Sequence, residues 1–245
     1  MILLIKLLLA HLLGDFLLQP DNWVKAKEKK KLGAWQLYLH TLIHFVLIML
    51  LVSDFTFWNW AALLALAHLL IDVIKLYSVK KTRQRSYFFI DQAAHLLVIT
   101  GIWLLYLFYA GKAFPLQNLP SGHLLLIITA VYALTSPTSI AIKFFISKWT
   151  PHTLTDDEDS LLEAGKTIGI LERLFVFVFV LSGHWEAIGF LLAAKSIFRF
   201  GDLKESKERK LTEYVLIGTL VSFGIAMAAG ILFNKLLMGN LTLMQ

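Results

Sequence analysis

The amino-acid sequence predicts an all-α integral membrane protein, a polytopic bundle of about eight transmembrane helices. Apolar residues make up 58% of the 245 residues, charged residues only 16%, and the mean hydropathy is +0.69. Soluble domains are about half apolar and a quarter charged, so this composition indicates a lipid environment. The Leu-rich runs are long enough to cross a hydrocarbon core of roughly 30 Å, which takes about 20 helical residues.

Eight apolar runs mark the expected spans, whose ends sequence alone places only to within a few residues. They cover approximately residues 1–19, 35–53, 55–77, 86–111, 121–148, 166–183, 185–200 and 211–238. The first run lacks the basic start and the small-residue cleavage site of a signal peptide, so we expect it to be retained as a helix. We expect one membrane domain, in which residues 1–111 form a four-helix metal-site bundle and residues 112–245 form four further helices packed on it.

The distribution of the 23 lysines and arginines predicts the topology. Eighteen lie in or beside alternate loops, whereas only Lys6, Lys112 and Lys235 lie on the other side of the membrane. The positive-inside rule places the basic loops in the cytoplasm and therefore both termini outside it. The net charge of +6 follows from this distribution, so we expect the lipid bilayer, and not a nucleic acid, as the partner. The chain has no cysteine, which excludes disulfides and thiolate metal ligands.

Each of the first four runs carries a pair of metal-competent side chains spaced four residues apart. The pairs are His11 and Asp15, His40 and His44, His68 and Asp72, and Asp91 and His95. Residues four apart lie one turn apart on the same face of a helix. The order is mirrored about the basic turn between the third and fourth runs, which predicts that antiparallel helices bring His68 beside His95 and Asp72 beside Asp91.

The direction of each run also brings the four pairs to matching depths. Counted from the cytoplasmic ends, one member of each pair lies about five residues into its run and the other about nine, which predicts two layers roughly 6 Å apart. The shallow layer holds Asp15, His40, Asp72 and Asp91, and the deep layer holds His11, His44, His68 and His95.

These eight side chains predict a buried metal site of the kind that helical bundles build. Ionisable groups inside a membrane cost at least about 3 kcal/mol each unless they are partnered, so they face the bundle interior. No lysine or arginine of these runs lies at the same depth, so we expect a divalent cation to offset the three aspartates. Imidazole and carboxylate ligands suit Zn²⁺, Fe²⁺ or Mn²⁺. The site can hold one ion, or two ions that share an aspartate. Some of the eight side chains can instead orient the histidines that bind the metal. A metal-free His–Asp network and a haem held by paired histidines are the alternatives.

The second half of the chain has two polar features. The fifth run is interrupted by Thr135-Ser136-Pro137-Thr138-Ser139, which predicts a broken helix that serves either packing or contact with a substrate or ion. The last three runs carry charged residues near their cytoplasmic ends, namely Glu172, Arg173, Lys195, Arg199 and Glu213. These residues either form ion pairs, Glu172 with Lys195 and Glu213 with Arg199, or leave a surplus positive charge for a substrate phosphate or carboxylate.

Four segments carry a resemblance to a known family. The opening LLLAHLLGDFLLQ and the later GKTIGILER, AAKSIFRF and EYVLIGTLVS resemble the bacterial membrane family catalogued as domain of unknown function 3307 (DUF3307). This resemblance, which extends over nearly the whole chain, implies a bacterial inner-membrane protein with no assigned activity. The His/Asp pairs on membrane helices are more distantly similar to membrane-bound metal-dependent hydrolases, in residue type only.

Taken with the residue pattern, these features favour a membrane-embedded metal-dependent hydrolase. A bound metal would activate water, and Asp15 would serve as general base. The charged residues of the last three runs would hold an amphiphilic, lipid-like or anionic substrate that enters from the cytoplasmic leaflet. A metal-ion or proton-coupled transporter, a haem or di-iron redox protein and a metal-stabilised scaffold remain alternatives. The almost purely apolar outer halves of the first four runs argue against a transport path.

Overall fold

The computed structural model describes residues 1–79, 83–111, 123–149, 159–197 and 206–238, and these residues are helical apart from short turns. The chain divides into two compact units, Met1–Thr129 and Ala130–Gln245. Each unit is considered by itself below. Arg199, which sequence analysis places among the substrate-binding residues, lies outside the described residues.

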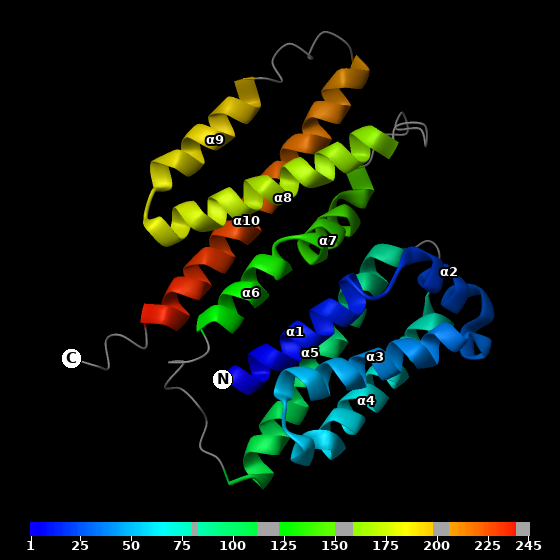
Figure 1. Ribbon diagram of the computed structural model, residues 1–245. Coiled ribbons are helices and arrows are strands. Elements are labelled where there is room, and N and C mark those ends of the chain that lie inside the picture. The colour runs from blue at the N-terminus through cyan, green and yellow to red at the C-terminus, as the bar shows by residue number, and fades with distance from the viewer. Residues whose placement is uncertain (80–82, 112–122, 150–158, 198–205, 239–245) are drawn as a thin grey trace. The chain divides into compact units, whose positions relative to one another are not determined.

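The first unit is built on four long helices that surround a common interior. They are α1 (Ile2–Phe16), α3 (Trp35–Val52), α4 (Trp58–Ser78) and α5 (Gln84–Tyr109). The helices form a closed ring in which α1 packs on α3, α3 on α4, α4 on α5 and α5 on α1 (Figure 1). All four pairs of metal-competent side chains therefore lie on neighbouring helices.

One part of this interior is apolar. It is filled by a cluster of Leu7, Ala10, Ile48, Phe57, Ala61, Leu64, Ile99, Trp103 and Leu107, drawn from all four helices and the turn before α4. Large side chains on the outer faces, such as Leu97 and Phe108, are 74% and 79% exposed. Apolar faces of this extent suit lipid contact and not water.

A short helix, α2 (Asp21–Lys30), follows α1 at a bend of 79°. Pro20 lies at the start of α2, where its fixed φ is tolerated, and it disfavours helical geometry in the residue before it, so α1 ends ahead of it. The bend carries α2 away from the direction of α1 and brings Lys27 into the bundle, where it is 5% exposed.

The second unit contains α7 (Ser136–Ile146), α8 (Asp159–Ser182), α9 (Trp185–Ile197) and α10 (Ser206–Met238). The helix α6 (His123–Ala133) crosses the boundary between the units and leads into α7. Within the second unit α10 packs along α8 and α7, and α9 packs on α8. Gly230 lets α10 approach α8 closely, since a Cβ there would lie 2.7 Å from Cγ1 of Val180.

Helix length and hydropathy make this a multi-pass membrane protein, with five candidate spans among the described residues, or six if α1 and α2 form one bent span. The five are Trp35–Val52, Phe55–Ser78, Gln84–Tyr109, His123–Trp149 and Thr212–Leu237. Sequence analysis expects eight, and the difference lies in α1, α8 and α9. The first of these has 15 residues and the last 13, or about 20 Å at 1.5 Å per residue, which is shorter than a hydrocarbon core. The apolar part of α8 carries three charged residues, Lys166, Glu172 and Arg173.

Candidate metal centre

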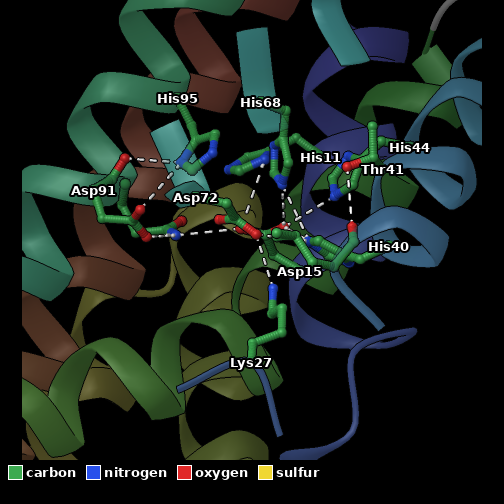
Figure 2. Close-up of polar contacts among 12 residues, drawn as sticks. His11, Asp15, Lys27, His40, Thr41, His44, His68, Asp72, Asp91 and His95 are labelled. Atoms are coloured by element: carbon green, nitrogen blue, oxygen red, sulfur yellow. Dashed lines mark hydrogen bonds and ion pairs between the residues drawn. The ribbon is translucent and has the colours of Figure 1, made fainter. Parts of the chain in front are cut away.

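The structure brings all eight predicted side chains of the first four runs together inside the first unit (Figure 2). Each of α1, α3, α4 and α5 supplies one pair, because residues four apart on a helix project from the same face. Seven of the eight residues are between 1% and 7% exposed, and the side chain of Asp15 is 10% exposed. Three overlapping sets of donor atoms lie within 4.8 Å of one another: His11, Asp15, His44 and His68; His40, His68 and Asp72; and Asp72, Asp91 and His95.

Asp15 lies at the centre of the group. Its Oδ1 atom is 3.0 Å from Nε2 of His44, 3.3 Å from Nε2 of His40 and 3.5 Å from Nε2 of His68. Nε2 of His40 is 3.1 Å from Nε2 of His68. The two layers that residue counting predicts are therefore joined, since Asp15 and His40 of the shallow layer contact His44 and His68 of the deep one.

The deep histidines pack ring against ring. The ring centroids of His44 and His68 are 3.8 Å apart, those of His68 and His95 4.1 Å, and those of His11 and His95 5.2 Å. Both ring nitrogens of His11 and Nε2 of His95 are buried without a hydrogen-bond partner in the described part of the chain. Buried polar atoms are nearly always satisfied, so unpaired nitrogens gathered at one place suit a bound water or ion as their partner.

A small cavity adjoins these rings. It has a volume of about 20 Å³ and is lined by four histidines, His11, His44, His68 and His95, and by five apolar residues, Leu7, Ile48, Leu64, Val98 and Ile99. This volume suits one water-sized molecule. It is far too small for a porphyrin, so the packing of the rings does not favour the haem alternative.

Two lysines change the electrostatics expected from the sequence. Nζ of Lys27 donates to Oδ2 of Asp72 at 2.8 Å, and Nζ of Lys75 donates to Oδ2 of Asp91 at 2.7 Å. The expectation that all three carboxylates lack a cationic partner in the chain is therefore wrong. It failed because Lys27 comes from α2, which lies outside the apolar runs, and because the long Lys75 side chain reaches back from the end of α4.

Asp15 keeps a different environment, since its partners in the described residues are imidazoles and one amide. Nε2 of Gln92 donates to Oδ2 of Asp15 and to Oδ2 of Asp91, both at 3.3 Å. Sequence reasoning missed Gln92, although its position next to Asp91 on the helix that supplies His95 gives a hint. The amide orients the carboxylate but brings no charge.

Gly14 is a second residue that sequence reasoning missed. A Cβ at this position would lie 2.4 Å from Cε1 and 2.5 Å from Nε2 of His44, so the His44 ring lies directly against the backbone of α1. The Gly-Asp step in the HLLGDFLLQ segment thus has a packing reason, since Gly14 makes room for the imidazole that Asp15 contacts.

Three charged residues of the second unit, Glu172, Arg173 and Lys195, bond to the protein itself. Nζ of Lys195 donates to Oε2 of Glu172 at 2.6 Å, as in the ion-pair interpretation of the sequence. Glu213 is exposed, and the pairing expected for it involves Arg199, which lies outside the described residues.

Arg173 holds the interruption between α6 and α7. Pro137 lacks the N–H that Ala133 O would otherwise accept, and the Thr138 hydroxyl donates to that carbonyl at 2.6 Å instead. Arg173 is 3% exposed and donates from Nε to Leu134 O at 2.6 Å. Its remaining contacts are to Thr135 O, Ser139 Oγ and Ser222 Oγ. These bonds to the chain favour the packing interpretation of the break over a contact with substrate.

Fold and site together define a multi-pass helical membrane protein with buried histidine–aspartate clusters whose donor atoms are spaced to hold a metal ion. Residues 3–118 match the family described as "Protein of unknown function (DUF3307)". The matched segment contains all eight residues of the cluster, whereas the segments GKTIGILER, AAKSIFRF and EYVLIGTLVS lie beyond it. No curated protein and no solved structure matches the chain.

Proposed function

We propose that this protein is a membrane-embedded metal-dependent enzyme, and that its reaction is a hydrolysis. The observation that carries the proposal is the position of the Asp15 carboxylate, within 3.5 Å of three imidazole nitrogens in the buried interior of the first unit. One carboxylate with several histidines is a donor set that Zn²⁺, Fe²⁺ and Mn²⁺ accept.

The cavity beside the deep histidines supplies the place for a reacting water. A divalent ion bound at this site would make its water a better nucleophile and would polarise the scissile group. Sequence analysis assigns the proton acceptor to Asp15, but the three surrounding imidazoles favour Asp15 as a ligand. We assign the acceptor to His11, which lines the cavity and whose Nδ1 lies 3.9 Å from Oδ2 of Asp15.

The proposed reaction balances without an oxidant or reductant. The water oxygen bonds to the carbonyl carbon or phosphorus of the substrate, and one water proton passes to the free ring nitrogen of His11. The bond to the leaving group then breaks, and the leaving group takes up that proton. His11 returns to its neutral form at the end of the cycle.

The substrate class follows from the surroundings of the site. The basic residues near the cluster, Lys27 and Lys75, come from the ends of the helices that sequence analysis places in the cytoplasm, and Lys25 and Lys29 of α2 are exposed. An anionic or lipid-like molecule entering from the cytoplasmic leaflet suits this arrangement. Glu172, Arg173 and Lys195 bond within the second unit itself, so they are not proposed to hold the head group of the substrate.

The cellular setting belongs to the same proposal. The basic loops and the family resemblance support a bacterial inner-membrane protein with both termini in the periplasm. The transporter alternative loses support, because the broken helix that suggested it is held by Arg173 and Thr138.

Substitution of one central histidine tests the proposal. The His68→Ala protein, purified in detergent without chelators, should lose its transition metal and its hydrolysis of amphiphilic ester and phosphoester probes, and should melt several degrees lower, because a ligand also pins its helix. His184→Ala is the matched control, since His184 is exposed outside the cluster and should leave all three readouts unchanged. Wild-type protein that is folded, holds no metal and is not stabilised by added Zn²⁺, Fe²⁺ or Mn²⁺ would contradict the proposed function.

A further inference from the structure

The three buried carboxylates of the first unit differ in what neutralises them. Asp72 and Asp91 each accept from a lysine ammonium group at 2.8 and 2.7 Å. Asp15 has only imidazoles and the Gln92 amide around it in the part of the chain that the structure describes. Asp15 is therefore the carboxylate that needs a cation from outside the chain.

Lys27 neutralises Asp72 from within the chain. Its ammonium group lies on Oδ2, which is also the oxygen that faces Nε2 of His40 at 3.9 Å. An ammonium group cannot ligate a metal, and an ion placed beside it would meet a like charge at low dielectric. Lys27 is 5% exposed, so it cannot swing into water while α2 stays in place.

The surroundings of Asp15 have the spacing of a four-ligand shell. A tetrahedral ion with bonds of about 2.0–2.1 Å separates its ligand atoms by about 3.3–3.4 Å. Oδ1 of Asp15 is 3.0, 3.3 and 3.5 Å from Nε2 of His44, His40 and His68, and Nε2 of His40 and His68 are 3.1 Å apart. These separations are four of the six edges of such a tetrahedron, and each lies close to that length.

Charge balance also favours one metal ion over two. Three carboxylates set against two ammonium groups and one divalent ion leave a single net positive charge in the bundle. A second divalent ion would leave three, in an environment that penalises uncompensated charge.

We infer that the bundle holds one metal ion and not two, on Oδ1 of Asp15 and Nε2 of His40, His44 and His68, with Lys27 and Lys75 as permanent counter-ions of Asp72 and Asp91. The inference rests on the proposed metal function and narrows it. His11 and His95 then stand beside the ion, facing the cavity, and are not part of a second site.

Metal stoichiometry tests the inference on the full-length protein in detergent. Elemental analysis after equilibration with Zn²⁺ and removal of free ion should give one equivalent per wild-type chain. The Asp15→Asn protein should bind Zn²⁺ about 100-fold more weakly or not at all. The double variant Lys27→Met/Asp72→Asn removes the ion pair without leaving a charge, and should keep one equivalent with an affinity within about threefold of wild type.

The outcomes separate the inference from the proposed function. Two equivalents in the wild type, full binding by Asp15→Asn, or loss of metal from a folded Lys27→Met/Asp72→Asn protein would overturn the one-ion inference and leave the metal function standing. No binding of Zn²⁺, Fe²⁺ or Mn²⁺ by the wild type would end both. If Asp15→Asn does not fold, the wild-type stoichiometry and the double variant still decide the number of ions.

Discussion

Replacing Gly14 by Ala tests whether the His44 ring must lie directly on the backbone of α1. An added Cβ would lie 2.4 Å from Cε1 and 2.5 Å from Nε2 of His44, whereas ordinary contact begins near 3.4 Å. The ring must therefore retreat by roughly 1 Å. The contact between Nε2 of His44 and Oδ1 of Asp15, now 3.0 Å, would be lost or reoriented.

The size of the effect follows from this displacement. A ligand atom displaced by about 1 Å falls outside the ±0.2 Å within which metal–ligand distances vary. Overpacking of this kind costs ~1–3 kcal/mol. If this free energy destabilises the metal-bound protein, metal binding weakens by roughly 5- to 140-fold. Ala also favours a helix over Gly by up to ~1 kcal/mol, so the metal-free protein should lose little stability.

The measurement is a Zn²⁺ competition titration combined with thermal melting, with and without metal. Gly101→Ala is the matched control, because it makes the same change on α5 where an added Cβ meets nothing within 4 Å. The control should bind Zn²⁺ as the wild type does. If Gly14→Ala also keeps wild-type affinity, the close approach of His44 to α1 is unimportant and the assignment of His44 as a ligand is refuted.

Two further predictions concern other parts of the chain. Arg173→Met should destabilise the protein by about 3–5 kcal/mol, because carbonyls and hydroxyls at the α6–α7 break lose a buried charged donor; denaturant unfolding measures this, and the exposed Lys166→Met serves as control. A destabilisation equal to that of the control would show that Arg173 does not hold the break. Cysteines introduced after Lys30 and Arg83 should react with a membrane-impermeant reagent only from the cytoplasm, and one after Phe57 only from the periplasm. The reverse pattern would place the His/Asp cluster in the opposite leaflet.

The cluster of eight His and Asp side chains was predictable because two regular properties of helices determine where these side chains lie. A spacing of four residues fixes the face, and alternating direction fixes the depth, so His68 and His95 meet without knowledge of packing. The number of spans was less predictable, because hydropathy marks α1, α8 and α9 as apolar but does not reveal where each helix bends or ends. The 79° bend after α1 depends on Pro20 and on the docking of α2 against the rest of the bundle.

The counter-ions were not predictable by the same reasoning. Lys27 belongs to a run of lysines whose obvious meaning is topological, and only the docking of α2 separates it from its exposed neighbours Lys25 and Lys29. The partners of Arg173 were not predictable either. Its guanidinium group donates to backbone carbonyls that are available only because the helix is broken between α6 and α7. Long side chains reach partners that sequence spacing does not specify.

The pairing of Lys27 with Asp72 and of Lys75 with Asp91 bears on the order of events during biogenesis. A nascent bundle that carried three bare carboxylates would be costly to assemble in lipid before it met a metal ion. With two of them neutralised from within the chain, insertion and helix packing need not wait for cofactor supply. Under the one-ion inference, metal loading would be a late step confined to the surroundings of Asp15, and a cell short of metal would accumulate an assembled but inactive protein and not a misfolded one.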